Sequence, residues 1–372
     1  MKVRLEDVCD RGSSNLKQSD IVDTSGNYPI YGASGYISNV DFYHQDKPYV
    51  AVVKDGAGIG RTTLHPAQSS VIGTMQYLIP KENILPEYLY YVVRYMHLEK
   101  YFTGATIPHI YFKDYKNEQF NLDSLEKQKE IIDILGNCER VITKREEELQ
   151  KLDKLIKARF VEMFGDPVKN TKGWQVKRLE ELSIQINSGN TPKGGSSIYV
   201  DEGIAFFRSQ NVWKDRLEME DIVYISNDIH VSMKRSSLKN GDILMTKTGR
   251  INTENSSLGR AALYMGEDDK ANVNGHVYFI RLKPEVNNKF ILRILVSVEY
   301  RDLIRSVCVG GIDKRQLNKE HIENFPIICP PDNLVDKYIE LVDHIDKSKV
   351  EVKKALDEAQ LLFDSLMQKY FG

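Results

Sequence analysis

The strongest constraint on the fold of this chain is that its second half repeats its first. Short patterns recur in the same order: Leu5-Glu6-Asp7-Val8 as Leu179-Glu180-Glu181-Leu182, Val71-x-Gly73 as Val273-x-Gly275, Tyr88-Leu89 as Phe290-Ile291, and Phe164-Gly165 as Phe371-Gly372. The spacing between the copies varies because the second half carries insertions. The repeat predicts a globular unit followed by a long helix, and then the same pair again. A single chain with such an internal dyad suits a partner that is itself nearly two-fold.

Hydrophobic periodicity divides the 372 residues into two kinds of segment. Residues 1–122 and 166–329 contain short β-prone runs, such as 49–53 and 277–280, separated by turns. Residues 123–165 and 330–372 instead place apolar residues at steps of three and four, with Glu and Lys between them. These boundaries predict an α+β fold, in which two mixed α/β domains form a pseudo-two-fold repeat separated by two long helices.

Each predicted helix carries one narrow apolar stripe. The first stripe comprises Ile131, Ile134, Cys138, Val141 or Ile142, Arg145, Leu149, Leu152, Ile156, Phe160 and Met163. The second comprises Leu334, Tyr338, Leu341, Ile345, Val352, Ala355, Ala359, Leu362, Leu366 and Tyr370, with Val342 and Phe363 expected to lie off it. Packing one stripe against the other in an antiparallel coiled coil would bury both. The alternative is that each helix packs on its own domain.

Composition excludes several classes of protein. The net charge of −2 supplies no global attraction for nucleic acid, so any DNA contacts must be local or assisted by another subunit. No apolar run approaches the ~20 residues of a membrane span, and we expect a cytoplasmic protein with no membrane contact. The four cysteines form no C-x-x-C pair, which argues against disulfides and a zinc site.

Motifs for catalysis are missing from the sequence. There is no Asn-Pro-Pro-Tyr for base methylation, no phosphate-binding G-x-x-x-x-G-K loop and no metal-binding histidine spacing. The strand at 49–53 does run into Gly56-Ala57-Gly58-Ile59-Gly60, but a cofactor loop would need a helix directly afterwards. Because β-branched residues and Pro66 follow instead, the pattern favours a strand–loop–strand turn that presents Lys54 and Arg61.

Together, the repeat, the helices and a set of paired motifs resemble the DNA-specificity subunit of type I restriction–modification systems. The motifs are Tyr28-Pro29-Ile30-Tyr31-Gly32, Asn190-Thr191-Pro192, residues 206–212, the paired loops Lys54…Gly60-Arg61 and Lys247…Gly259-Arg260, Gly310-Gly311-Ile312, and Asn324-Phe325-Pro326-Ile327 before Pro330-Pro331. One departure is the entry to the first helix, where Asp123 or Ser124 would act as a cap in place of the proline pair.

The resemblance implies a function as well as a fold. It implies two target-recognition domains that each read one part of a bipartite site in double-stranded DNA. The two helices would set the gap between the half-sites and dock two modification (methyltransferase) subunits. The chain itself would be non-catalytic and hold no cofactor, with S-adenosylmethionine bound by the partner modification subunit. Whether restriction or translocase subunits join the complex stays open.

Candidate DNA-binding residues follow from the chemistry of base reading, in which Arg and Lys suit guanine and Asn and Gln suit adenine. They are Tyr31, Ser34, Lys54, Arg61 and His109 in the first half, and Thr191, Lys193, Arg208, Gln210, Asn211, Lys247, Arg250, Arg260, Lys314 and Arg315 in the second, with Asn252 and Asp313 in the same clusters. Structural alternatives remain for several of them. Arg208 could pair with an acid, His109 could be a satisfied loop residue, Lys314 and Arg315 could cap a helix, and Tyr31 could belong to the core.

Two other classes of function remain open on the sequence alone. A solitary DNA-modifying enzyme would require a cofactor or metal site that no motif supplies, and cofactor binding by the isolated chain would reveal it. A two-headed linker that binds proteins would lose activity on mutation of a recognition loop without losing DNA retention.

Overall fold

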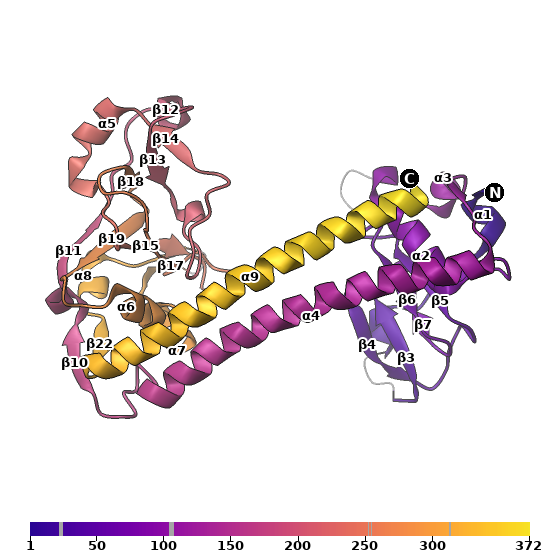
Figure 1. Cartoon of the computed structure of the whole chain (residues 1–372), viewed down its shortest axis with the longest axis horizontal. Coiled ribbons are helices and arrows are strands. Elements are labelled where there is room, and N and C mark those ends of the chain that lie inside the picture. Colours follow the sequence, from indigo (N-terminus) through magenta and orange to yellow (C-terminus); the bar gives the residue numbers. More distant parts are fainter. Residues whose placement is uncertain (22–24, 104–107, 252, 254, 312–313) are drawn as a thin grey trace. The chain divides into compact units, whose positions relative to one another are not determined.

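In the computed structural model, the chain forms two compact units, which are described separately. The first unit comprises Met1–Gln150 and Lys349–Gly372, and the second comprises Lys151–Ser348. Figure 1 shows that each unit joins a globular part to portions of two long helices, α4 (Leu125–Phe164) and α9 (Asp332–Phe371). The structure describes all residues except 22–24, 104–107, 252, 254 and 312–313.

The first unit is built on a four-stranded antiparallel sheet with the order β2-β8-β5-β6. Its central strand β5 is buried along its whole length, and α2 packs against the sheet. The elements of this unit before the long helix are β1 (Lys2–Arg4), α1 (Leu5–Val8), β2 (Cys9–Ser13), η1 (Gln18–Ile21), β3 (Tyr28–Gly32), β4 (Gly35–Val40), β5 (Tyr49–Val53), β6 (Thr62–His65), β7 (Ser70–Val71), β8 (Met75–Pro80), α2 (Pro86–Tyr95), η2 (Leu98–Tyr101), α3 (Phe112–Tyr115) and β9 (Gln119–Asn121).

The second unit contains a corresponding sheet with the order β11-β19-β15-β17, and α6 packs against it. Its elements are β10 (Gln175–Arg178), η3 (Leu179–Leu182), β11 (Ser183–Ser188), η4 (Gly195–Ile198), β12 (Tyr199–Val200), β13 (Ile204–Phe207), η5 (Ser209–Asn211), β14 (Val223–Ile225), α5 (Asn227–Ser232), η6 (Lys234–Ser236), β15 (Ile243–Thr246), β16 (Thr248–Gly249), β17 (Ala261–Leu263), β18 (Ala271–Val273), β19 (Val277–Leu282), α6 (Asn288–Leu295), α7 (Val298–Val307), β20 (Val309–Gly310), β21 (Arg315–Gln316), α8 (Lys319–Glu323) and β22 (Pro326–Cys329).

The strand pairings confirm the repeat predicted from the sequence. A terminal antiparallel pair, β1 with β9 or β10 with β22, occurs in each unit. A smaller sheet in each unit also combines an antiparallel pair with a parallel one, β4-β3-β7 in the first and β14-β13-β18 in the second. The second unit enlarges this smaller sheet with β12, which accounts for part of its additional length.

The long helices α4 (Leu125–Phe164) and α9 (Asp332–Phe371) are both 40 residues long. In the first unit, Ile131 near the start of α4 shares a core with Phe363 and Phe371 at the end of α9. In the second unit, the Phe164 ring at the end of α4 lies 5.3 Å from the ring of Tyr338, near the start of α9. Opposite ends of the two helices therefore pack together, as an antiparallel pair requires.

The predicted stripes need correction at several positions. Ile134 is 38% exposed, and Leu135 is fully buried in its place. Leu362 is 54% exposed, whereas Val342 and Phe363, expected off the stripe, are buried. The reason is that both helices also pack on the globular part of their unit, so that Phe363 lies against Tyr91 of α2. Each helix therefore packs both against the other helix and against the globular part of its unit, so both arrangements considered from the sequence occur.

The predicted helix boundaries have identifiable chemical causes. Ser124 accepts a hydrogen bond from the amide of Lys127 at 3.3 Å, which caps α4 as the sequence indicates. Gly165, with a φ of +76°, ends the same helix, and α9 begins directly after Pro330-Pro331. Among the residues that the structure describes, no helix combines the length and apolar character needed to cross a bilayer.

Candidate nucleic-acid interface

The paired loops predicted to face DNA have the same backbone hydrogen bonds in both units. In the first unit, the amide of Val53 donates to Arg61, and the amide of Gly60 donates back to Val53, both at 2.9 Å. In the second, Thr246 donates to Arg260 at 2.9 Å and Gly259 donates to Thr246 at 3.1 Å. A strand follows the glycines of each loop, β6 in the first unit and β17 in the second, which confirms the strand–loop–strand prediction.

A lysine begins each loop and is held by two further backbone bonds. The amide of Lys54 donates to the carbonyl of Thr74, and its own carbonyl accepts from the amide of Ile110, both at 2.9 Å. The amide of Lys247 donates to His276 at 2.8 Å, and its carbonyl accepts from Leu317 at 2.9 Å. The main chain of each lysine is therefore fixed by neighbouring segments of its unit, and both side chains are partly exposed.

The structure gathers the first-unit candidates around this loop. The guanidinium of Arg61 donates to the carbonyl of Ala33 at 3.0 Å, which places it beside the exposed Ser34. Nδ1 of His109 lies 2.6 Å from the carboxylate of Asp55, the residue that follows Lys54. The alternative of a satisfied loop histidine is thus confirmed, and Asp55 is a neighbour that the sequence did not single out.

Tyr31 occupies an intermediate position between core and surface. Its ring packs against His65 with a centroid distance of 4.5 Å and borders the cluster formed around Tyr49 and Tyr77. Partial burial, with the neighbouring Tyr36, raises the pKa of its phenol above the ordinary value, so the hydroxyl stays protonated near neutral pH. Tyr31 therefore packs against the hydrophobic cluster beneath the loop that begins at Lys54.

In the second unit, a small three-stranded sheet joins segments that are distant in sequence. Gly249 of β16 pairs with Arg315 of β21, and Arg315 pairs in turn with Gly310 of β20. This arrangement brings together Lys247, Arg250, Lys314 and Arg315, of which Arg250 and Lys314 are exposed. Helix α8 begins only at Lys319 with Asn318 as its N-cap, so the helix-capping alternative for Lys314 and Arg315 is wrong.

Two candidates, Thr191 and Lys193, lie in the segment that follows β11 and approach the surroundings of Lys247. The hydroxyl of Thr191 accepts from the amide of Gly275 at 3.3 Å, next to the His276 carbonyl that holds Lys247. Lys193 is exposed two residues further on. Asn252 and Asp313, also named from the sequence, lie outside the described residues.

Arg208, Gln210 and Asn211 form a separate group around Asp221. The guanidinium of Arg208 forms a 3.0 Å ion pair with the Asp221 carboxylate, to which Gln210 also donates at 2.7 Å. These hydrogen bonds, from Gln210 and then Arg208, hold the pKa of Asp221 below its ordinary value. Asn211 is fully buried and caps the amide of Arg208 at 3.0 Å. The acid-pairing alternative for Arg208 is confirmed, and Asn211 has a structural role in this loop.

Arg260 differs from its counterpart Arg61 in being buried. It is only 8% exposed, its guanidinium carbon lies 4.0 Å from the ring centre of Trp213, and it donates to the carbonyl of Ser256 at 3.0 Å. Burial and the nearby cations Arg301 and Arg216 lower its pKa from the ordinary value. Its contacts with Ser256 and Trp213 hold the end of the second loop against the protein interior.

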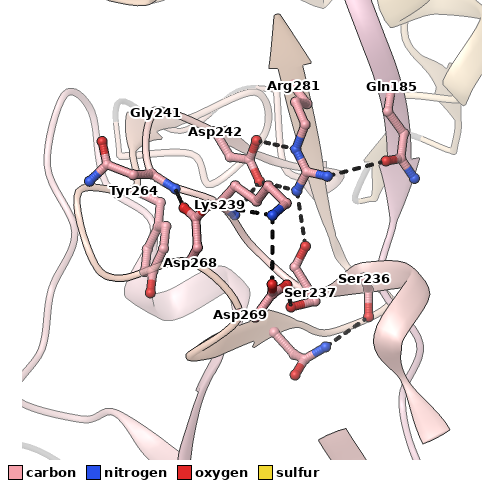
Figure 2. Close-up of polar contacts among 12 residues, drawn as sticks. Gln185, Ser236, Ser237, Lys239, Gly241, Asp242, Tyr264, Asp268, Asp269 and Arg281 are labelled. Carbon is pink, nitrogen blue, oxygen red and sulfur yellow. Dashed lines mark hydrogen bonds and ion pairs between the residues drawn. The ribbon is translucent and has the colours of Figure 1, made fainter. Parts of the chain in front are cut away.

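The sheet that carries Lys247 is fixed at the opposite end of β15 by a buried ion pair. Arg281 contacts Asp242 through two nitrogens, at 2.9 and 2.7 Å, and the Asp242 side chain is only 1% exposed. Figure 2 shows the two side chains facing each other, with Lys239 and Asp268 beside them. Burial raises the pKa of Asp242 even though Arg281 opposes the shift. Because Gln185 of β11 also accepts from Arg281 of β19 at 3.5 Å, this network connects β11, β19 and the start of β15 at the end of the sheet away from Lys247.

Metal-binding geometry is not found in the part of the chain that the structure describes, where no three His, Cys, Asp or Glu side chains are grouped to hold an ion. The polar groups that the two loop regions present are instead Lys and Arg side chains, hydroxyls and backbone groups. These are the groups that contact phosphates and base edges in protein–DNA complexes.

Comparisons with known proteins agree with this geometry. A family model described as the type I restriction modification DNA specificity domain matches residues 1–154 and 171–359. The MjaIX specificity subunit of a type I restriction enzyme from Methanocaldococcus jannaschii is 24% identical over 319 residues, covering 78% of this chain and 69% of the relative. The MjaVIII specificity subunit from the same organism is 22% identical over 330 residues, covering 84% and 76%.

Solved structures show the same fold. The S subunit of a type I restriction–modification system from M. genitalium aligns with a TM-score of 0.62 at 15% identity, covering 100% of this chain and 96% of that one. A chain from a study of complex assembly and conformational transition of the type I R-M system aligns with a TM-score of 0.56, also at 15% identity, covering 100% and 97%. With two matched domains, a duplicated loop and paired long helices, the chain belongs to the family of type I restriction–modification DNA specificity proteins.

Proposed function

We propose that each unit of this specificity subunit reads one part of a bipartite site in double-stranded DNA. The observation that carries the proposal is the duplicated loop, in which Lys54 and Lys247 hold the same place in matching backbone networks. Rigid loops with forked or cationic side chains suit base reading in the major groove. The reading set that the geometry supports is Ser34, Lys54 and Arg61 in one unit, and Thr191, Lys193, Lys247, Arg250, Lys314 and Arg315 in the other.

The remaining candidates are proposed to support the reading loops. Arg208, Asn211 and Arg260 form hydrogen bonds within the protein, Gln210 is bonded to Asp221, and His109 is bonded to Asp55. Tyr31 packs under the first loop. Substitution of these residues is expected to weaken DNA binding through loss of loop order.

Specificity subunits are non-catalytic, so the chemistry of the complex belongs to partner subunits. We infer that two modification subunits dock on α4 and α9, bind S-adenosylmethionine and methylate adenine. The helices would also set the gap between the half-sites. Apolar side chains that remain exposed on these helices in the described structure, including Val141, Leu155 and Leu361, support a docking role.

A reconstitution experiment tests the proposed function. The isolated chain should bind DNA weakly, because its net charge is −2, and should not methylate it. Addition of the modification subunit should give tight binding to one bipartite sequence and adenine methylation that depends on S-adenosylmethionine. Methylation by the chain alone would contradict the proposal, as would a complex that binds all sequences equally.

A further inference from the structure

We propose that a cationic cluster on the second unit binds phosphates of the DNA backbone beside the recognition loops. The cluster consists of the wholly or partly exposed Lys157, Lys214, Arg216, Arg301 and Arg305, with the buried Arg260 adding positive charge beneath them. The proposal rests on the proposed function, since the same duplex would occupy both surfaces. Among the candidate residues named from the sequence, only Arg260 belongs to this cluster.

The centre of the cluster is a fixed turn around Trp213. The guanidinium carbons of Arg260 and Arg216 lie 4.0 and 5.4 Å from the centre of the Trp213 ring. The amide of Trp213 donates to Arg216 at 3.0 Å, and the amide of Asp215 donates to Ala261 at 2.8 Å. Because Asp215 also pairs with Arg293 of α6, the turn is fastened to the core while Lys214 at its tip stays exposed.

Basic side chains from separate elements act electrostatically on Lys214. Partial burial lowers the pKa of its ammonium, and so do Arg301, Arg260, Lys157 and Arg305. Arg301 and Arg305 lie on α7, Arg260 lies directly before β17, and Lys157 lies on the C-terminal part of α4. These four cations repel the ammonium of Lys214, and a polyanion bound beside them would relieve that repulsion.

The acids at the rim of the cluster are already paired. Arg216 contacts Glu218 at 2.5 Å and Arg305 contacts Asp302 at 3.3 Å. Exposed ion pairs of this kind contribute little and exchange readily, so both guanidiniums can also face a phosphate. Lys214 has no ion pair with any acid that the structure describes.

Continuity with the recognition loops favours DNA over an acidic protein surface. Helix α7, which carries Arg301 and Arg305, leads through Cys308 into β20, the partner of the strand that holds Arg315. Arg260 closes the loop that begins at Lys247. The cluster therefore adjoins the recognition loops. The backbone of a duplex bound to those loops, which carries a phosphate charge about every 1.7 Å of its axis, would pass beside the cluster.

The counterpart of α7 in the first unit carries fewer basic side chains. The segment that follows α2, as α7 follows α6, is the short η2, whose Lys100 pairs with Glu118 at 2.5 Å. Glu99 of η2 lies against Gly60, at the place where Ile304 of α7 lies against Gly259. Because η2 has no arginine in place of Arg301 and Arg305, we expect the second unit to contribute more than the first to the salt dependence of DNA binding.

The test compares variants of the full chain assembled with its modification subunits. Lys214→Gln/Arg305→Gln removes two cluster charges, Lys214→Arg keeps the charge, and Lys169→Gln is a control whose side chain is 80% exposed in another loop. Dissociation constants are measured across a salt series for the recognised duplex and for a scrambled duplex. Thermal unfolding and co-purification check folding and assembly.

We expect the double variant to lower the slope of log K against log salt by about 0.9 for each phosphate that the protein no longer neutralises. Its affinity should fall by the same factor on both duplexes, with the half-site sequences unchanged, while the other two variants match the parent. An unchanged slope would overturn the proposal. So would loss of the modification subunits from the double variant, which would identify a protein-docking surface. A parent complex that does not distinguish the duplexes would instead refute the proposed function.

Discussion

Lys54 and Lys247 occupy the same structural position in the two units. The amide of each donates to a residue of the turn that precedes an inner strand of the sheet, Thr74 or His276, and the carbonyl of each accepts from Ile110 or Leu317. The side chain of Lys247 also lies over Tyr278, with its nitrogen 5.7 Å from the ring centre. Two lysines in matching frames fit the proposal that each acts on its own part of the DNA site.

Alanine substitution of either lysine should therefore affect one half-site only. Lys54→Ala, Lys247→Ala and the neighbouring Arg250→Ala are tested against duplexes in which each base pair of the site is changed in turn. Removal of a base contact should cost ~1–3 kcal/mol against its cognate base, whereas removal of a phosphate contact should weaken all duplexes alike. A variant that changed the preference at both half-sites would contradict independent reading.

The glycines that precede Arg61 and Arg260 should differ in their tolerance of a side chain. Gly60 has a φ of +80°, and a Cβ there would lie 2.6 Å from the backbone nitrogen of Glu99. Gly259 has a φ of +66°, but its Cβ would meet the Ile304 side chain at 2.8 Å. Since backbone yields less readily than a side chain, Gly60→Ala should destabilise the protein more than Gly259→Ala does.

Gly173 provides the control for this comparison. It has a φ of +71° and no atom within 4 Å of its would-be Cβ, so Gly173→Ala should show only the ~1–2 kcal/mol cost of the left-handed backbone. Urea-induced unfolding of the three variants measures the differences. Equal losses of stability for Gly173→Ala and Gly60→Ala would mean that the close approach to Glu99 has no energetic consequence.

The buried His65 should make the first unit sensitive to acid. Burial lowers its pKa from 6.5 to about 4, and its ring packs between Tyr31 and Tyr49. The native state thus binds its proton less tightly than the unfolded state, so this contribution to stability is present above pH 6.5 and is lost as the pH falls to about 4. The shift corresponds to roughly 3 kcal/mol.

A phenylalanine at position 65 would remove this titration while keeping a ring in the aromatic cluster. The free energy of unfolding of His65→Phe should depend less on pH between 6.5 and 4 than that of the parent chain. The exposed His97, replaced by Phe, serves as the control. If parent and His65→Phe lost stability in parallel, another group would be responsible for the acid sensitivity.

Much of the architecture could be predicted from the sequence because it depends on local signals. Periodicity, Ser124 and Gly165 define α4, and the run 49–53 gives a strand buried on both faces. The side of each helix that is buried could not be assigned with the same accuracy. Ile134 and Leu135 are adjacent, and the tertiary packing of the first unit's core, to which Leu135 belongs, determines that Leu135 is the buried one.

The binding residues were harder to predict because repeat position does not fix exposure. Arg61 and Arg260 occupy matching positions, yet only Arg61 reaches the surface. The second loop is longer and folds back, so that the carbonyl of Ser256 and the ring of Trp213 enclose Arg260. Nothing in the local sequence shows that Trp213 returns to this loop, since the contact depends on the tertiary fold.

The ion pair between Asp242 and Arg281 should contribute more to stability than the neighbouring contacts of Lys239. Arg281→Met would leave a carboxylate that is 1% exposed without its cationic partner, which typically costs 3–5 kcal/mol. Lys239 reaches Asp268 at 3.4 Å and Asp269 at 3.6 Å near the surface, so Lys239→Met should cost at most about 1 kcal/mol.

The pH dependence of the Arg281→Met variant gives a second and independent signature. Burial already raises the pKa of Asp242, and loss of Arg281 should raise it further. A carboxyl whose pKa is higher in the folded state binds its proton more tightly there, so the variant should lose stability as the pH rises through that folded value. Below it, Asp242 is neutral and needs no partner, so the deficit relative to the parent should shrink. Urea unfolding at acidic and neutral pH measures both effects, and a deficit that did not vary with pH would show that Arg281 acts through packing rather than charge.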